Sequence, residues 1–213
     1  LDNKKYPTTV GDEGGFAPSL SNNEDAIELI IEAIALAGFK PGKDVSLCLD
    51  VASNALFKNG KYSIKSSDFE TIEETIQYYI DLLKKYPIGS IEDPFAEDDW
   101  KSWISFTKII KSNNFWNPKI QIVGDDLFVT NRERLLKGIN EKAANAILIK
   151  PNQIGTLTET YDVINLAHEN GYNTIISHRS GDTEDSFIAD LAVGTQSTQL
   201  KSGAPARSES NCL

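Results

Sequence analysis

The sequence predicts an α/β fold in which parallel strands alternate with helices and form a TIM-like (β/α) barrel. Two observations predict it. Short apolar runs rich in β-branched residues alternate along the chain with longer amphipathic stretches, and a charged residue follows each run. The first pattern is typical of a parallel sheet with helical crossovers. The second gathers charged groups at one end of the sheet, where barrel active sites form.

Seven apolar runs are the predicted strands. They are short and mostly do not alternate with polar residues, as expected for strands that are buried on both faces. They are Thr8–Gly11, Val45–Leu49, Ile88–Ile91, Ile120–Val123, Ala146–Ile149, Thr174–Ile176 and, with the weakest pattern, Ser197–Leu200. Taken alone, these strands fit either an open doubly wound sheet or a closed barrel.

Helical patterns lie between the apolar runs. Glu24–Ala37 places four isoleucines on one face and is followed by Gly38, a residue type common just after a helix end. Ser67 with Glu70 fits a capping box that opens a helix reaching Lys85. The other predicted helices are Asn131–Ile139, Thr156–Asn170 and Asp182–Val193.

Composition excludes several classes of function. The formal charge of −10 argues against nucleic acid as a primary ligand, because phosphate backbones bind basic patches. Cys48 and Cys212 form neither a disulfide framework nor a CxxC metal motif, which favours a reducing, cytoplasmic setting. No apolar run approaches the ~20 residues of a membrane span, and no signal peptide opens the chain. The absence of Met and the abrupt C-terminus lead us to expect a piece of a longer polypeptide.

Charged and polar residues follow all seven predicted strands, and they favour the barrel. They are Asp12 and Glu13, then Asp50, then Glu92 and Asp93, then Asp125 and Asp126, then Lys150, then Ser177 to Ser180 with His178 and Arg179, and last Lys201. A single charge after a strand only marks where the chain leaves the core. Seven in succession, with carboxylates first and cations later, do not fit that reading. In a barrel the carboxyl ends of all strands open on one side, so we expect these groups to meet in one pocket.

Three carboxylates of this set, Asp50, Glu92 and Asp125, follow consecutive strands and predict a metal site. Clustered carboxylates repel one another unless a cation lies among them. A ligand set of oxygens without His or Cys favours Mg²⁺ over Zn²⁺. A single Asp at the start of a loop is usually a solvated surface group, but the three together indicate a magnesium site.

Two lysines and a cationic tripeptide are the other candidates. Lysines are rare in protein cores, so Lys150 and Lys201 at strand ends stand out. Near a metal or another cation the pKa of a lysine should fall, which makes it a plausible general base. His178, Arg179 and Ser180 offer a fork for a phosphate or carboxylate together with a hydroxyl. His178 on its own would be interpreted as an ordinary loop histidine.

Glu13 lies in the motif Gly11-Asp12-Glu13-Gly14-Gly15. This is not a phosphate-binding glycine motif, and we infer no nucleotide site from it. An acidic pair between glycines on the same face can instead supply a general acid. A base, an acid and a metal together fit one class of reaction. The base removes a weakly acidic proton next to a carboxylate, the metal stabilises the enediolate, and the acid expels the leaving group.

Seven stretches in the same order resemble enolase of the bacterial type, over nearly the whole chain. They are Val10–Pro18 (VGDEGGFAP), Leu49–Ala52 (LDVA), Ser90–Phe95 (SIEDPF), Val123–Asn131 (VGDDLFVTN), Ile147–Gly155 (ILIKPNQIG), Ser177–Gly181 (SHRSG) and Ile188–Thr195 (IADLAVGT). The resemblance implies that residues 1–213 are part of an enolase C-terminal catalytic barrel domain, with about seven of eight strands and no N-terminal α+β domain. It implies Mg²⁺-dependent, reversible dehydration of 2-phospho-D-glycerate to phosphoenolpyruvate in glycolysis, the phosphopyruvate hydratase (lyase) reaction.

The resemblance also implies a role for each candidate. Asp50, Glu92 and Asp125 match the magnesium ligands, and the last two also face substrate. Lys150 matches the base that removes the proton, Glu13 the acid that assists loss of the hydroxyl, and His178 a histidine near that leaving group. Arg179 and Ser180 match binders of the substrate phosphate, and Lys201 matches the residue that holds its carboxylate. The implied assembly is a homo-oligomer, a dimer or an octamer, in the cytoplasm, and surface or secreted forms rest on the resemblance alone.

Some residues depart from the family pattern. Asn54 and Ala55 stand where the family usually has Ser and Glu, which puts the local support of Asp50 in doubt. The match ends after Glu209, because Ser210–Leu213 diverge. The family's first barrel strand, with a further essential acid, and its mobile loop are missing from these residues. We therefore expect the 213 residues alone to lack dehydratase activity and to expose an unpaired strand edge that favours aggregation.

Two alternatives stay open. One is another enzyme of the enolase superfamily, such as a racemase or a lactonising enzyme. Those enzymes use a Lys-x-Lys pair or a His/Asp dyad, whereas here Lys150 is followed by Pro151 and Asn152, and His178 by Arg179. The other is a catalytically incompetent fragment or a non-catalytic binding protein.

Overall fold

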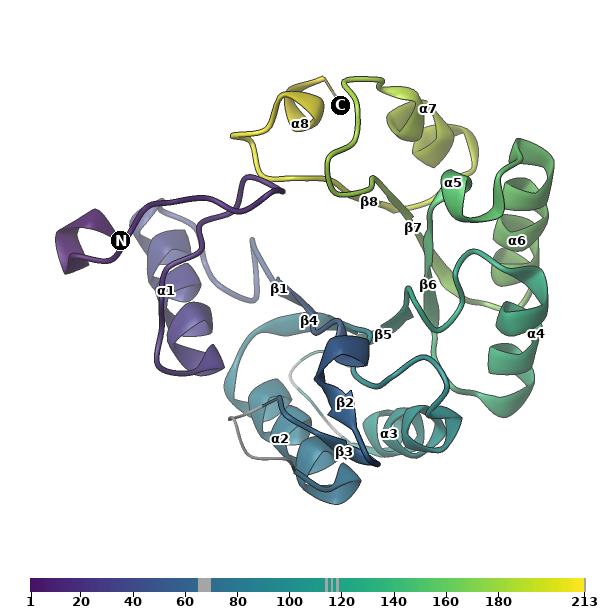
Figure 1. The fold of residues 1–213 in the computed structure, drawn as a ribbon, viewed down its shortest axis with the longest axis horizontal. Helices are drawn as coiled ribbons and strands as arrows, with labels where there is room; N and C mark the ends of the chain where they lie inside the picture. Colours follow the sequence, from purple (N-terminus) through teal and green to yellow (C-terminus); the bar gives the residue numbers. More distant parts are fainter. Residues whose placement is uncertain (65–69, 114, 116, 118, 213) are drawn as a thin grey trace. The chain divides into compact units, whose positions relative to one another are not determined.

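The computed structural model describes residues 1–64, 70–113, 115, 117 and 119–212 (Figure 1). The chain divides into two compact units. Unit 1 comprises Leu1–Ser19, Phe128–Lys137 and Ala146–Leu213, and unit 2 comprises Leu20–Leu127 and Gly138–Asn145. Each unit contains parallel strands and helices, so the predicted α/β class is confirmed.

Unit 2 contains three parallel strands in the order β1 (Leu47–Asp50), β4 (Ile88–Glu92) and β5 (Gln121–Gly124). Strands β4 and β5 are deeply buried, because Ile88, Ile91 and Ile122 have no exposed surface, whereas most of β1 is exposed or half-buried. Each strand is a short apolar segment that ends at or just before a carboxylate. The carboxyl ends of the three strands therefore carry the acidic residues of this unit.

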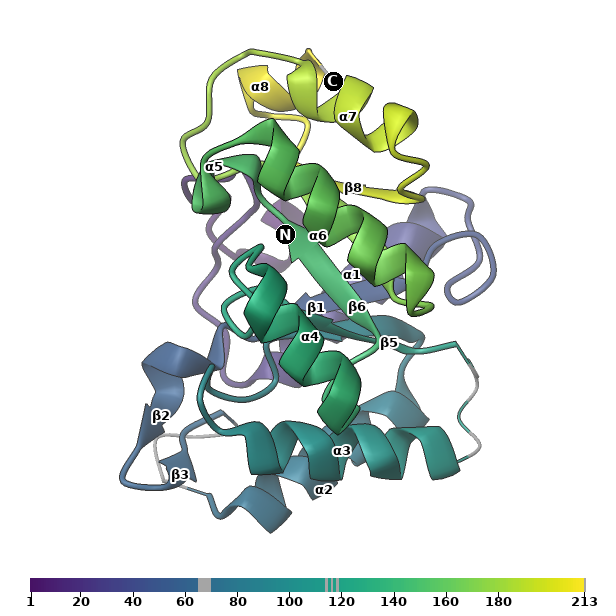
Figure 2. The same cartoon turned by 90° about the vertical axis from the view of Figure 1, so that its right-hand side faces the viewer.

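Three helices accompany these strands: α1 (Asn23–Leu36), α2 (Ile72–Lys85) and α3 (Trp100–Ser112). Helices α2 and α3 lie side by side (Figure 2). Phe95, in the loop after β4, packs in edge-to-face geometry against Trp103 and Phe106 of α3, with ring centroids 6.4 and 5.6 Å apart. This aromatic cluster fixes the loop that leaves β4. Glu92, the last residue of β4, lies where that loop begins.

A small hairpin in unit 2 follows the 3₁₀ turn Ser53–Leu56, and its strands are β2 (Phe57–Lys58) and β3 (Lys61–Tyr62). Its turn residues, Asn59 and Gly60, both have positive φ, as this tight turn requires. Tyr62 closes the hairpin onto the core, because its hydroxyl donates to Asp99 at 2.8 Å and accepts the Ala96 N–H at 3.0 Å. Burial raises the pKa of Tyr62, which keeps this hydroxyl protonated.

Unit 1 contains the parallel strands β6 (Ala146–Ile149), β7 (Asn173–Ser177) and β8 (Gln199–Lys201). Helix α6 (Leu157–Glu169) packs against β6 and β7 (Figure 2). The shorter helices of this unit are η1 (Asp2–Lys4), α5 (Pro151–Ile154), α7 (Phe187–Gly194) and α8 (Ser208–Asn211). Helix α4 (Arg132–Glu141) has residues in both units. No helix in the described ranges is long and apolar enough to span a membrane.

The predicted strand Thr8–Gly11 is wrong. Val10 makes one isolated antiparallel bridge to Phe16, and the Gly11 N–H donates to Gly15 O at 2.9 Å. The glycine-rich segment turns the chain back on itself, so the run has no parallel partner. Six strands pair in parallel in the described residues, three in each unit, and not seven.

Two predicted helix starts are also wrong. Helix α2 begins at Ile72, with a capping box formed by Thr71 and Glu74, while Glu70 makes an antiparallel bridge to Tyr62. Ser67, the predicted cap, lies outside the described residues. Helix α7 begins at Phe187 and not at Asp182. The Asp182 carboxylate accepts the Arg179 N–H at 3.1 Å, so it stabilises a turn before the helix.

Candidate active site

The carboxylates predicted to bind metal all belong to unit 2. The strand register pairs Asp50 with Glu92 and Glu92 with Val123, so Asp125 lies two residues beyond their level. Residues in register point to the same face of a parallel sheet, and so do residues two apart along a strand. The register thus places Asp50 and Glu92 on one face, and Asp125 follows directly after the end of β5. Glu92 is 6% exposed and Asp125 8%, whereas Asp50 is exposed.

Asp93 anchors the loop that follows β5. Its Oδ1 accepts the Asp125 N–H and its Oδ2 accepts the Asp126 N–H, both at 2.9 Å. Its φ of 41° lies in the left-handed region, which Asp tolerates better than most residues. Burial raises the pKa of Asp93 to about 8, the two backbone donors oppose the rise, and the charges of Asp125 and Asp126 add to it. Asp93 therefore sets the backbone position of both following aspartates.

Within the described ranges, one group of three acidic side chains has its ligand atoms within 4.8 Å of one another: Asp93, Asp125 and Asp126. The predicted metal ligands share only Asp125 with it. Its oxygen donors fit a hard cation such as Mg²⁺, whose charge would relieve the repulsion and favour the ionised form of Asp93. Because both Asp93 oxygens already accept backbone N–H groups, we interpret Asp93 as the anchor of this group.

Asn54 links two carboxylates at the same end of unit 2. Its Nδ2 donates to Glu97 at 3.0 Å and to Asp126 at 2.8 Å, and its Oδ1 accepts the Glu97 N–H at 2.8 Å. Next to it, the buried Ser53 hydroxyl donates to Asp93 O at 2.7 Å. The departure from the family pattern at residue 54 therefore adds contacts between the loop after β1 and the acidic loops.

The two predicted lysines belong to unit 1 and lie at its strand ends. Ile149 pairs with Ile176, and Ser177 pairs with Lys201. One further step along β6 brings Lys150 level with Ser177 and hence with Lys201. Both lysines are half-buried. The carboxyl end of unit 1 thus presents two ammonium-bearing side chains at one level.

Glu13, His178 and Ser180 come together in unit 1 although 167 residues separate Glu13 from Ser180. The Ser180 hydroxyl donates to Glu13 Oε1 at 2.6 Å, and His178 Nε2 lies 3.7 Å from the same oxygen. His178 is 2% exposed, and neither ring nitrogen has a hydrogen-bond partner in the described part of the chain. A buried, unpaired imidazole is costly and is a feature of sites that handle protons or ligands.

Arg179 lies on the exposed side of this group. Its guanidinium donates to Asn152 Oδ1 of α5 at 3.3 Å, and its backbone N–H donates to Asp182. The side chain is therefore directed by the helix that follows Lys150. Exposure and the planar donor set suit binding of a phosphate or carboxylate.

The C-terminal segment from Gly203 to Arg207 packs on the loop that carries Glu13. The Ala204 N–H donates to Glu13 O at 2.7 Å. A Cβ added to Gly203 would lie 2.9 Å from the same oxygen, and one added to Gly14 would lie 2.6 Å from Arg207 Cγ. Both glycines are needed for this close approach, so the segment fixes the backbone of Glu13.

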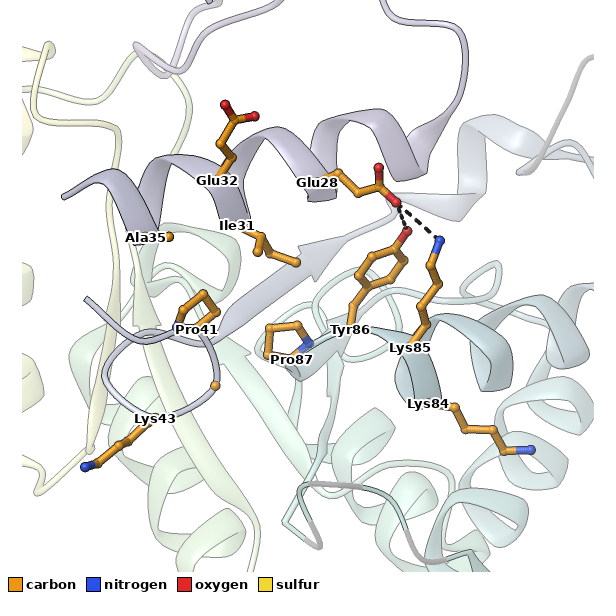
Figure 3. A pocket seen from close by; sticks show the side chains of 11 residues that line it. Glu28, Ile31, Glu32, Ala35, Pro41, Lys43, Lys84, Lys85, Tyr86 and Pro87 are labelled. Atoms are coloured by element: carbon orange, nitrogen blue, oxygen red, sulfur yellow. Dashed lines mark hydrogen bonds and ion pairs between the residues drawn. The ribbon is translucent and has the colours of Figure 1, made fainter. Parts of the chain in front are cut away.

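A hollow of about 750 Å³ in unit 2 lies away from these carboxylates (Figure 3). Residues of α1 and the segment just before β4 line it, and Glu28 accepts hydrogen bonds from Tyr86 at 2.7 Å and Lys85 at 3.2 Å at its edge. Tyr86 and Pro87 precede β4, so the hollow is at the amino end of that strand. Active sites of barrels form at the opposite, carboxyl end, and we do not assign this hollow to the chemistry.

Comparison with known proteins identifies the family of the chain. The family model of the enolase C-terminal TIM barrel domain matches residues 1–212. An enolase from Pelagibacter ubique (strain HTCC1062) is 58% identical over 206 residues, which cover 97% of this chain and 48% of that relative. The chain thus spans about half the length of the curated relative that it matches.

Proposed function

Because the chain belongs to the family of enolase C-terminal TIM barrel domains, we propose that it supplies the metal-binding and proton-transferring half of an enolase. The reaction is the reversible dehydration of 2-phospho-D-glycerate to phosphoenolpyruvate in glycolysis. The observation that carries the proposal is the 58% identity to an enolase over 97% of the chain. The residues of each unit give it a chemical basis.

Asp50, Glu92 and Asp125 would hold Mg²⁺ in this proposal. Bound there, the cation supplies positive charge that stabilises the enediolate formed from the substrate carboxylate. The Asp93 carboxylate accepts one backbone hydrogen bond from Asp125 and one from Asp126, which keeps both in place, and Asn54 restrains the side chain of Asp126.

Lys150 would take the proton from the carbon next to the substrate carboxylate. Lys201, level with it, would bind that carboxylate. Glu13 would give a proton to the departing hydroxyl, so that water leaves as the double bond forms. His178 lies close enough to Glu13 to share in this transfer, and Arg179 and Ser180 would bind the phosphate.

A homo-oligomeric enzyme in the cytoplasm is part of the same proposal. The Pelagibacter ubique relative is named an enolase. The resemblance to enolases implies assembly into a dimer or an octamer. A low count of cysteines in a chain without a disulfide supports a reducing compartment.

A chimera tests the function directly. The 206 matched residues of the Pelagibacter ubique enolase would be exchanged for those of this chain, and the chimera assayed for phosphoenolpyruvate formation with Mg²⁺. We expect activity in the range of the unaltered relative. A folded chimera that binds 2-phosphoglycerate without dehydrating it would contradict the proposal and favour a non-catalytic role.

The 213 residues alone provide the matching control. We expect them to form no phosphoenolpyruvate in a coupled assay, because the family's remaining acidic residue and mobile loop belong to the other half of the protein. Product formation by the isolated chain would show that these residues suffice.

A further inference from the structure

A strained turn in unit 1 lies directly against the backbone of Lys150. Residues Phe128–Asn131 form a four-residue turn closed by the Asn131 N–H, which donates to Phe128 O at 2.8 Å. The two central residues, Val129 and Thr130, have φ of 44° and 53°. Such turns usually carry Gly, Asn or Asp at these positions, and β-branched residues rarely adopt positive φ.

Thr130, the second central residue of this turn, has a completely buried side chain. Its Oγ1 accepts the backbone N–H of Lys150 at 2.9 Å and donates to Gln153 Oε1 at 2.7 Å. The Gln153 N–H in turn donates to Lys150 O at 2.9 Å. The three residues thus form a closed ring of hydrogen bonds that holds Lys150 by both its N–H and its C=O.

Lys150 is the first residue after the end of β6, so its backbone position depends on contacts outside that strand. The described pairing of β6 with β7 ends at Ile149, and Pro151 follows, without an N–H and with a fixed φ. Lys150 is therefore the hinge between β6 and α5, with extended backbone angles of −122° and 101°. The Thr130 hydroxyl accepts the N–H of this residue, the first beyond the end of β6.

We propose that Thr130 is a positioning residue for Lys150, and that the strained turn at Phe128–Asn131 delivers its hydroxyl. This rests on the proposed function, in which Lys150 is the base. Strained backbone that persists in a native structure concentrates where geometry matters for function. A small misplacement of a base relative to the proton it removes lowers the rate of the chemical step far more than it lowers substrate affinity. We therefore expect the Thr130 hydroxyl to affect kcat and not substrate binding.

The test uses the chimera with Thr130→Val, which keeps the shape and β-branching but removes the hydroxyl, and Thr130→Ser, which keeps the hydroxyl. The matched control is Thr107→Val in unit 2, where a buried threonine donates to Ala143 O at 2.6 Å, away from the strand ends that carry the candidate site. The readouts are kcat, KM, the melting temperature, and the isotope effect with substrate deuterated at the carbon that loses its proton.

For Thr130→Val we expect kcat to fall about ten- to a hundredfold. We expect KM to change by less than about threefold and the isotope effect to rise, because proton removal becomes slower relative to the other steps. Thr130→Ser should restore kcat to within about threefold of the parent. Thr107→Val should lower the melting temperature and leave kcat and the isotope effect unchanged.

The proposal is overturned if Thr130→Val behaves like Thr107→Val, or if Thr130→Ser is as impaired as Thr130→Val. If Thr130→Val does not fold, Gln153→Met is tested in its place, because it removes the acceptor of the Thr130 hydroxyl. It should lower kcat and raise the isotope effect, and unchanged values would overturn the proposal. An inactive parent chimera would instead refute the proposed function, and the role of Thr130 with it.

Discussion

Replacing Asp93 by Ala should lower the free energy of unfolding, because its one carboxylate holds the backbone of two other residues. The carboxylate is 4% exposed and accepts two backbone N–H groups, those of Asp125 and Asp126, each at 2.9 Å. At a pH above its raised pKa of about 8, where unfolding is to be measured, the Asp93 carboxyl is ionised. A hydrogen bond to a charged acceptor contributes about 1.5 to 3 kcal/mol, so the two together contribute about 3 to 6 kcal/mol. Burial of the carboxylate, which raises its pKa, offsets part of this. We expect a net loss of about 2 to 4 kcal/mol in the free energy of unfolding.

Asp93→Asn is the matched variant. It keeps one acceptor oxygen and tolerates the φ of 41°, but it turns an amide NH₂ toward the second N–H donor. Its loss should be smaller, about 1 to 2 kcal/mol. Guanidinium denaturation of the Mg²⁺-free chimera would measure both. A stability of Asp93→Ala equal to that of the parent, or a larger loss for Asn than for Ala, would refute the anchoring role.

Two further predictions concern the metal and the loop of Glu13. In the chimera, Asp50→Ala, Glu92→Ala and Asp125→Ala should each weaken Mg²⁺ binding at least about tenfold by calorimetry, because each removes an anionic ligand; unchanged affinity in all three would make the metal assignment wrong. Gly203→Ala should lower kcat about tenfold, since its Cβ would lie 2.9 Å from Glu13 O and shift that backbone. Gly194→Ala, where an added Cβ meets nothing within 4 Å, is the control, and equal kcat for the two variants would contradict the packing argument.

Most of the parallel strands were predictable because they are short apolar segments. The apolar runs before Asp50, Glu92 and Lys150 correspond to β1, β4 and β6 within two residues at either end. Other elements were missed although the sequence carried a signal. Asn59-Gly60 is a typical hairpin turn, and Trp103 and Phe106 of α3 have helical spacing.

The candidate site was predictable where it depends on strand ends, and less so where it depends on loops. Glu13 and Ser180 were expected in one pocket because both were placed after parallel strands. They do form a hydrogen bond, but the run before Glu13 is not a parallel strand, so the turn at Gly11–Gly15 and not a strand end places Glu13. The anchoring by Asp93 and the hydroxyl of Thr130 did not follow from any periodicity. Both depend on left-handed backbone at residues that seldom adopt it, and on hydrogen bonds that join separate loops. A sequence pattern records neither.

The most direct test of the central claim is the rate of phosphoenolpyruvate formation by the chimera with Lys150→Met. This change removes the ammonium group and keeps most of the length of the side chain. We predict a fall in kcat of about 10²- to 10⁴-fold, the usual contribution of a general base, with Mg²⁺ affinity and melting temperature unchanged. A folded Lys150→Met chimera that keeps the parent's rate would show that this chain does not supply the base.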